Sequence, residues 1–438
     1  MAESGQSEVA RTVGVVGATA IIVGFVIGVS VFVLPGSLAG STGPGVVVSY
    51  AAASLLGLLA GVVGAQLGCA YQTDAASFVA VSQLLGVRWG FLLVWMIVGA
   101  SAIGVGLLAL GLANYLGNVL TVEVRGVAVG AVLVSGAVNL CGARAGAGLQ
   151  LVLVVAFLAA LFLFVGAGLP AVDGDLLSPF LPRGAGPVFA AIVPAYFSYA
   201  GFFVIIELAG EIESPAQTIP RAMAISFVLV VVTYLAVALT LVGLVPWEAL
   251  GGDPAPVVTA ARRVLPEALM LPLALTAVAA GASSINGILL AYSRDLHALA
   301  ERGLLPRKLL LHARSLPDRT AGVVPMTLLA LVAVMSSGDI TALATQAVLG
   351  ILFAQVLLGL ALWQLPRRDP HRLATAGFVL PSVALRASAG LLVVASAAIA
   401  LLVVAGSPRQ AALAGAFLGL GGLVHALSVR RGSPQQSL

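Results

Sequence analysis

The first long apolar stretch of the sequence is interrupted by small residues at its centre. It contains Gly24 and Gly28, followed by Val29 and Ser30, with Pro35 close behind. Glycine weakens a helix because it loses more conformational freedom on folding than any other residue. Two interpretations follow. Either the glycines let a second helix approach closely, or the backbone at Gly28, Val29 and Ser30 is unwound and its free polar groups bind a ligand.

A second stretch that is prone to break lies far along the chain. Pro194 is followed by a run of aromatic and small residues, namely Phe197, Ser198, Tyr199, Gly201, Phe202 and Phe203. Proline removes a backbone donor and disrupts the preceding helical turn, so we expect freed carbonyl groups here. The aromatic side chains either pack in the core or line a pocket for an apolar group.

Two adjacent hydroxyl groups, on Ser283 and Ser284, lie in a third apolar stretch. Together with carbonyl groups of an unwound helix they are candidate ligands for a sodium ion. Alternatively, each hydroxyl binds the backbone of its own helix. We expect no other metal and no cofactor.

The composition shows which elements must position these residues. Of 438 residues, 60% are hydrophobic and 9% are charged, whereas a soluble domain carries about 25% charged residues. A membrane-spanning helix needs about 20 apolar residues, and the sequence supplies such stretches in succession. It therefore predicts an all-α integral membrane protein with about twelve spans: 12–34, 45–67, 91–116, 126–140, 145–169, 188–208, 222–245, 269–292, 323–335, 343–365, 387–405 and 411–427.

The distribution of basic residues predicts the orientation. With both termini in the cytoplasm, all of the 21 Lys and Arg residues lie inside except Arg125, Arg183, Arg262, Arg263 and Arg409. This is the expected bias, because basic residues of short loops are retained in the cytoplasm. The prediction is a multi-pass protein of the cytoplasmic membrane, with an outer loop helix within 246–265.

The break-prone stretches and two short spans recur five helices apart, which predicts an inverted repeat with a site near the midplane. The predicted organisation is a tail over 1–11, five helices over 12–169, five inverted helices over 188–365, two added helices over 387–427 and a tail over 428–438. Within the predicted spans the only charged residue is Glu207.

A zwitterion fits two broken helices without any charged side chain. Its carboxylate can accept from N–H groups of the first break and its ammonium group can donate to carbonyls of the second, aided by the helix dipoles. The expected ligand is therefore an amino acid, with an apolar side chain against the aromatic residues. Arg221 is expected to pair with Glu207 or Glu211 as an inner gate, and Pro220 to begin the seventh span.

Three segments resemble the amino acid, polyamine and organocation transporter superfamily. They are Ile27–Gly36, followed by Gly43-Pro44-Gly45, the junction Glu207–Ala222, and Ser293–Pro306. The resemblance covers the first ten spans and implies a five-plus-five inverted repeat of the leucine-transporter type. It implies that Gly28, Val29 and Ser30 hold the substrate carboxylate, that Phe197, Ser198 and Tyr199 offer carbonyls, and that Phe197 acts as an aromatic gate.

The sequence departs from this family pattern at positions that bear on coupling. Val29 and Ser30 replace a serine and a glycine, Phe203 stands where some members have a glutamate, and Phe157 stands where several proton-dependent members have a lysine. We therefore expect secondary transport of neutral amino acids that is coupled to sodium or proceeds by exchange. An amine or polyamine carrier, a channel and a transporter-like sensor remain alternatives, whereas an enzyme is disfavoured because no catalytic group lies at membrane depth.

Overall fold

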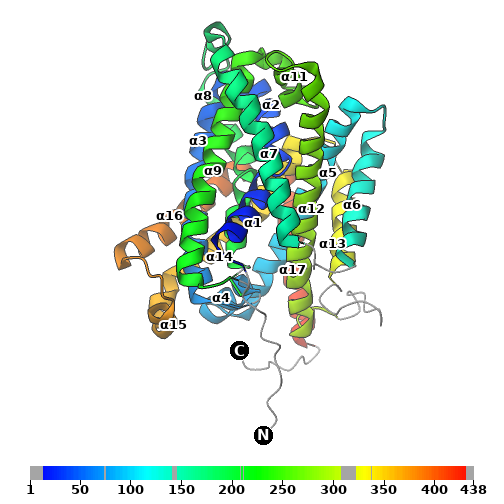
Figure 1. Cartoon of the computed structure of the whole chain (residues 1–438). Coiled ribbons are helices and arrows are strands. Elements are labelled where there is room, and N and C mark those ends of the chain that lie inside the picture. The colour runs from blue at the N-terminus through cyan, green and yellow to red at the C-terminus, as the bar shows by residue number, and fades with distance from the viewer. Residues whose placement is uncertain are drawn as a thin grey trace.

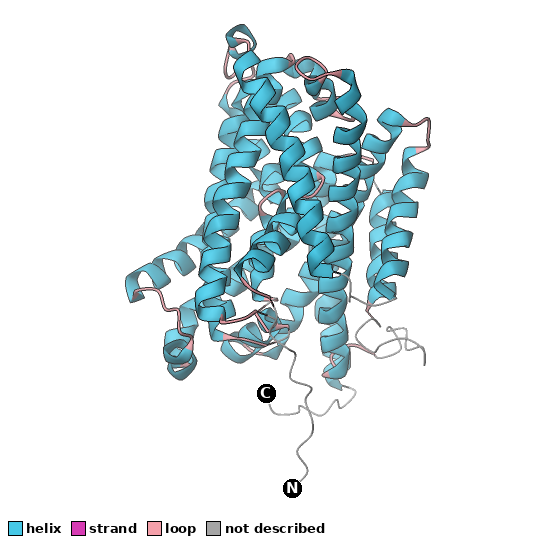
Figure 2. Ribbon diagram, viewed as in Figure 1, coloured by secondary structure: helices cyan, strands magenta, loops and turns pink. Residues whose placement is uncertain are grey.

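The computed structural model describes residues 13–73, 75–140, 146–207, 209–210, 212–306, 322–336 and 338–430. In these residues the chain is helical and contains no strand (Figure 2). A single parallel bridge joins Val13 to Ile212. The prediction of an all-α membrane protein is confirmed.

The helices of the first half contain one interrupted span. Their bounds are α1 (Val15–Ile27), α2 (Ser30–Thr42), α3 (Val46–Ala70), α4 (Ala76–Leu85), α5 (Val87–Val119), α6 (Val124–Leu140) and α7 (Gly146–Gly168). The 3-10 turns η1 (Gly43–Gly45), η2 (Leu169–Ala171) and η3 (Gly174–Leu177) connect them to their neighbours.

The second half begins with another interrupted span, α8 (Ala185–Phe197) and the 3-10 helix η4 (Ala200–Ile206). It continues with α9 (Pro215–Leu244), α10 (Trp247–Leu250), α11 (Pro256–Ala261), η5 (Glu267–Leu269), α12 (Met270–Glu301), α13 (Val323–Ser336), α14 (Ile340–Arg368), α15 (Pro370–Thr375), α16 (Ser382–Gly406) and α17 (Pro408–Arg430).

In the described residues, 9 helical segments are long and apolar enough to cross a membrane. The first of them, Val15–Ala70, contains both the broken α1–α2 element and α3, and α6 and α13 are shorter than the others. The count of twelve spans and the inverted repeat therefore stay predictions. The predicted tail over 1–11 lies outside the described residues, as do residues 431–438 of the predicted tail over 428–438, whereas residues 428–430 belong to α17.

The long helix α5 lies at the centre of the bundle. It packs against α12, α13 and α14 of the second half and against α6 of the first. The broken element α1–α2 packs on α7 and α9, and η4 packs on α3. Figure 1 shows α11 at one end of the bundle and α4 and α15 at the other; we call these the α11 end and the α4 end.

Three predicted helix boundaries are wrong. The first span ends at Thr42 and not at residue 34, because α2 continues past Pro35. The seventh span begins at Pro215, which occupies the first turn of α9, so Pro220 lies inside the helix. The eighth span continues beyond Tyr292 to Glu301 and includes Asp295, which is buried. Glu207 is therefore not the only charged residue within a span. An apolar-run criterion stops at the first charge, but backbone hydrogen bonds continue a helix wherever neighbours cover the polar side chains.

Candidate functional site

The first break separates α1 from α2 at Gly28 and Val29. Gly28 has φ 46° and ψ −151°, a conformation that essentially only glycine adopts. A Cβ atom at this position would also lie 2.5 Å from Oγ of Ser284 on α12. Gly28 therefore allows both the unusual backbone and the close approach of a second helix, whereas ligand binding at this break stays a prediction.

Hydroxyl groups form hydrogen bonds with the carbonyl groups at the end of α1. Ser284 donates to the Gly24 carbonyl at 2.8 Å, and Ser30 donates to the Ile27 carbonyl at 2.8 Å. The Tyr234 hydroxyl lies 3.2 Å from the same Ile27 carbonyl and 2.6 Å from Oγ of Ser30. These contacts satisfy acceptors that a helix end leaves without partners.

The start of α2 differs from the end of α1. Its N-cap residue is Val29, and within the described chain no side-chain capping hydrogen bond is formed there. A helix N-terminus carries partial positive charge and exposed donors. At this break, the carbonyl groups at the end of α1 therefore have hydrogen-bond partners, whereas the N–H groups at the start of α2 have no side-chain cap.

The second break follows α8. The α-helix ends at Phe197, and the chain continues through Ser198 and Tyr199 into the 3-10 helix η4. A Cβ atom at Gly57 of α3 would lie 2.9 Å from the Tyr199 side chain, and one at Gly201 would lie 2.9 Å from Val26. These glycines thus let η4 approach both α3 and α1.

A tyrosine cluster, formed by Tyr50, Tyr199 and Tyr234, connects the two breaks. The rings of Tyr50 and Tyr234 stack at 5.3 Å between centroids, and Tyr199 lies 6.2 Å and 5.4 Å from them. The Tyr50 hydroxyl lies 3.5 Å from Oγ of Ser198. Sequence reasoning missed Tyr50 and Tyr234 because neither belongs to a run of aromatic residues: Tyr50 is the single aromatic residue of its predicted span, and Tyr234 shares its span only with the distant Phe227.

A narrow cavity of about 50 Å³ lies beside the breaks. Among the predicted ligand-binding residues, Ser30, Phe197, Gly201 and Phe203 line it, whereas Gly28, Val29, Ser198, Tyr199 and Phe202 do not. The other lining residues are Phe25, Val26, Ile27, Ala100, Ser101, Gly104, Leu108, Ala200, Ile288, Tyr292 and Ile351. Within the described chain, none of the lining residues is charged.

The predicted residues that do not line the cavity pack around it. Val29 faces Gly111 and Gly281, where added Cβ atoms would meet its side chain at 3.1 and 3.3 Å. Phe202 packs on Phe227 at 5.6 Å between ring centroids. Phe157, the departure from the family pattern on α7, is buried.

Two aromatic residues line the side of the cavity that leads to Glu207, a residue of the predicted inner gate. Phe25 and Tyr292 line the cavity and contact each other edge to face at 6.3 Å. The Glu207 carboxylate oxygens are shielded from solvent, and Glu207 interacts electrostatically with Tyr292 and Asp295. Arg221 is exposed on α9. The predicted gate between Arg221 and Glu207 stays a prediction, and the alternative partner Glu211 lies outside the described residues.

The two predicted sodium ligands are buried on α12. The hydrogen bond from Ser284 runs to the Gly24 carbonyl on α1, not to its own helix. This brings a hydroxyl of the eighth predicted span against a carbonyl of the broken first span.

The α11 end is closely packed over α2. An added Cβ atom at Gly40 would overlap the backbone of Gly251, and one at Gly36 would overlap Pro256. The Tyr115 hydroxyl donates to the Phe32 carbonyl at 2.6 Å. The predicted outer loop helix is two short helices, α10 and α11, which pack on α2.

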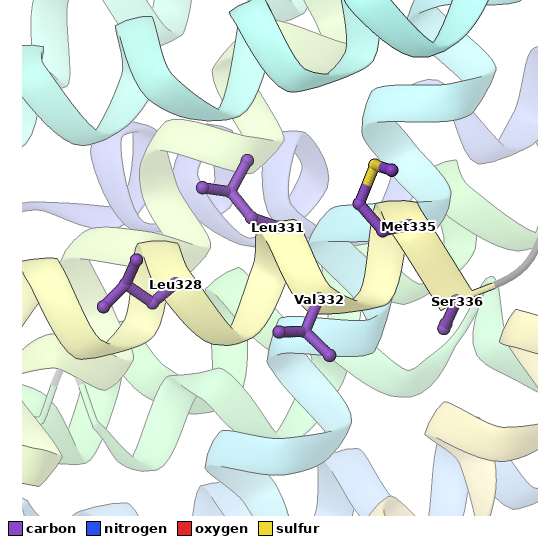
Figure 3. A pocket seen from close by; sticks show the side chains of 5 residues that line it. All are labelled: Leu328, Leu331, Val332, Met335 and Ser336. Carbon is purple, nitrogen blue, oxygen red and sulfur yellow. The ribbon is translucent and has the colours of Figure 1, made fainter.

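A larger hollow of about 470 Å³ lies on α13 and has a different character. It is lined by Leu328, Leu331, Val332, Met335 and Ser336 (Figure 3). Leu328, Val332 and Met335 are exposed. An exposed apolar surface on a membrane-spanning bundle faces lipid, so this hollow is unsuited to a polar solute.

Known proteins that are similar in sequence agree with this architecture, a helical bundle with a charge-free cavity beside two broken helices. Residues 13–421 match the amino acid permease family. The chain belongs to this family. The members are permeases, not enzymes, and the match supports amino acid transport by a multi-pass membrane protein.

Several named relatives share a quarter or more of their aligned residues with the chain. The branched-chain amino acid permease BcaP of Lactococcus lactis is 27% identical over 82% of this chain and 83% of its own length. The methylthioribose transporter of Bacillus subtilis is 26% identical over 70% of each chain. The human cationic amino acid transporter 4 is 25% identical over 57% of this chain and 43% of its own length.

Proposed function

We propose that the chain transports neutral amino acids with apolar side chains, which bind in the cavity beside the two breaks. The observation that carries this proposal is the lining of the cavity, which in the described chain has no charged residue and is largely apolar. Burying an unpaired charge in such a site would cost several kcal/mol. A relative named for branched-chain amino acids supports the same substrate class.

The backbone supplies the recognition of the zwitterion. The substrate carboxylate accepts from N–H groups at the start of α2, beside Ser30, where no side-chain cap competes. The ammonium group donates to carbonyls where α8 gives way to η4, near Phe197 and Ser198. The apolar side chain lies against Phe203, Ile288 and Ile351.

Transport follows by alternating access in the cytoplasmic membrane, with both termini inside. The closely packed contacts of α2 with α10 and α11 support a state in which the outer path is closed. Opening that path requires α2 to separate from Gly251 and Pro256, while Phe25 and Tyr292 close the inner path.

The test is equilibrium binding to the purified protein. We expect leucine, isoleucine and valine to bind, and their amides and decarboxylated amines to bind at least tenfold more weakly, because they lack the carboxylate. Uptake of radiolabelled leucine into proteoliposomes should follow the same order. Binding of arginine or lysine in preference to leucine would contradict the proposal.

Sodium coupling is the second part of the proposal. Ser283 and Ser284 and the carbonyls at the end of α1 supply oxygen atoms, which sodium requires, and the Ser284–Gly24 contact brings both kinds of ligand together. Uptake driven by a sodium gradient at balanced pH should accumulate leucine, and the Ser283→Ala/Ser284→Ala variant should lose this dependence. Accumulation driven by a pH gradient alone, and lost in Glu207→Gln, would refute sodium coupling.

A cationic substrate is the second candidate. Asp295 is buried on α12 and interacts electrostatically with Glu207 and with Tyr292, which lines the cavity, so these two carboxylates are the candidate counter-charges for a cationic side chain. The amino acid screen separates the candidates. If the chain carries cations, Asp295→Asn should weaken lysine binding and leave leucine binding unchanged.

A further inference from the structure

Gly104 on α5 faces the aromatic ring of Phe197. A Cβ atom built on Gly104 would lie 3.2 Å from two carbon atoms of that ring. Such a contact is slightly too close, so the ring would have to move by a few tenths of an ångström. Both residues line the cavity.

The direction of that movement determines its effect. The Phe197 side chain is half-buried, and the residues next to it in the chain, Tyr196, Ser198 and Tyr199, are fully buried. The ring can therefore yield more readily toward the cavity than into the bundle, since interiors are close-packed. A methyl group on Gly104 would narrow the cavity twice, once by its own volume and once by displacing the ring.

The neighbours of Gly104 on α5 define the same wall. Ala100, Ser101 and Leu108 also line the cavity, and positions 100, 104 and 108 share one face because residues four apart are neighbours on a helix. The missing side chain at 104 lets the Phe197 ring lie against α5 between Ala100 and Leu108, and Ile288 and Ile351 line the same cavity. This is the part of the cavity where an apolar side chain would lie.

We infer that Gly104 determines the size of the amino acid side chain that this permease accepts, acting through its contact with Phe197. The inference rests on the proposed binding of neutral amino acids in this cavity. Gly104 is a specificity-determining residue because its missing side chain leaves room for a branched or longer substrate.

The experiment measures dissociation constants for glycine, alanine, valine, leucine and phenylalanine with purified full-length protein and the variant Gly104→Ala. We expect Gly104→Ala to raise the dissociation constant for leucine and phenylalanine at least tenfold and to leave that for alanine within about twofold. Gly117→Ala is the matched control on the same helix, because its Cβ would make only an ordinary 3.6 Å contact with Val124.

Further variants keep the test decisive. Phe197→Leu in the Gly104→Ala background should restore leucine binding relative to alanine, because the smaller side chain gives back the space. Phe197→Leu alone should shift preference toward larger side chains. Equal changes for leucine and alanine in Gly104→Ala, or no change in either, would overturn the inference while leaving the proposed function intact. Failure of the wild-type protein to bind any neutral amino acid would instead refute the proposed function, and the inference with it.

Discussion

Hydroxyl groups, not charged side chains, stabilise the first break. Ser284, Ser30 and Tyr234 contact the last carbonyls of α1 from α12, α2 and α9. A hydrogen bond contributes about 0.5–1.5 kcal/mol net, but a buried carbonyl left without a partner costs about 1–3 kcal/mol. Removing one hydroxyl should therefore displace the break without unfolding the bundle.

Tyr234→Phe tests this at a single atom. The variant keeps the ring stacking with Tyr50 and removes the hydroxyl contacts with Ser30 and with the Val26 and Ile27 carbonyls. We expect the dissociation constant for leucine to rise on the order of tenfold, the equivalent of one good hydrogen bond. Isothermal titration of the purified variant measures it.

Tyr71→Phe is the control for that measurement. Burial raises the pKa of the Tyr71 hydroxyl to about 12, so the group is neutral, and in the described part of the chain it has no hydrogen-bond partner. Its removal should leave leucine binding unchanged. If Tyr234→Phe binds leucine as tightly as the wild type does, the hydroxyl has no role in positioning the break.

At the scale of elements, two helices meet through Gly28 and Ser284. An alanine at position 28 must adopt a conformation that costs about 1–3 kcal/mol for a residue with a side chain, and its Cβ would lie 2.5 Å from Oγ of Ser284. The side chain therefore points at α12 and not into the cavity, so its first effect is to separate α1 from α12.

A double-mutant cycle separates the cost of the backbone conformation at position 28 from the cost of the contact with Ser284. Gly28→Ala should lower the Tm of the purified protein by several degrees, and the loss in the Gly28→Ala/Ser284→Gly variant should be smaller than the sum of the two single losses, because Ser284→Gly relieves the contact. Contacting residues give interaction energies of about 0.5–3 kcal/mol. Strictly additive changes in Tm would show that the two residues do not meet.

The segment between α15 and α16 is held by one side chain. Gln66 of α3 donates to the Phe378 carbonyl at 2.9 Å and accepts from the Leu380 N–H at 2.9 Å. Gln66→Leu leaves both backbone groups without this partner. Each group that stays buried then lowers the stability of the protein by about 1–3 kcal/mol. We expect a lower Tm by differential scanning fluorimetry, whereas Gln217→Leu, an exposed position, should have no effect. Equal effects of the two variants on the Tm would contradict the role of Gln66 in holding this segment.

At the scale of the whole molecule, the two ends of the bundle should face opposite sides of the membrane. Gly252 follows α10 at the α11 end, and His371 lies in α15 at the α4 end; both are exposed. Because most basic residues belong to the predicted inner loops, we expect the α4 end in the cytoplasm.

Cysteine labelling in intact cells tests the orientation. In a background without native cysteines, Gly252→Cys should react with a membrane-impermeant maleimide and His371→Cys should react only after permeabilisation. The reverse pattern would invert the topology and would assign the closed α2 contacts to the inner side.

The sequence by itself determined the properties that depend on local composition. Apolar runs of sufficient length specify a helical membrane protein wherever they occur, and Gly28, Pro194 and their neighbours weaken a helix whatever surrounds them. Both helix breaks and the family were therefore predictable from the residues themselves.

Only the tertiary structure decided which residues meet. Spans that are apolar on all sides show no periodicity that would indicate which face points inward, so the sequence could not tell that Phe203 lines the cavity while Phe202 packs on Phe227. Tyr234 reaches the first break only because α9 packs on α1. Asp295 likewise becomes a buried residue only because the bundle covers the end of α12, since burial is a property of the packing of helices and not of a residue and its neighbours in the chain.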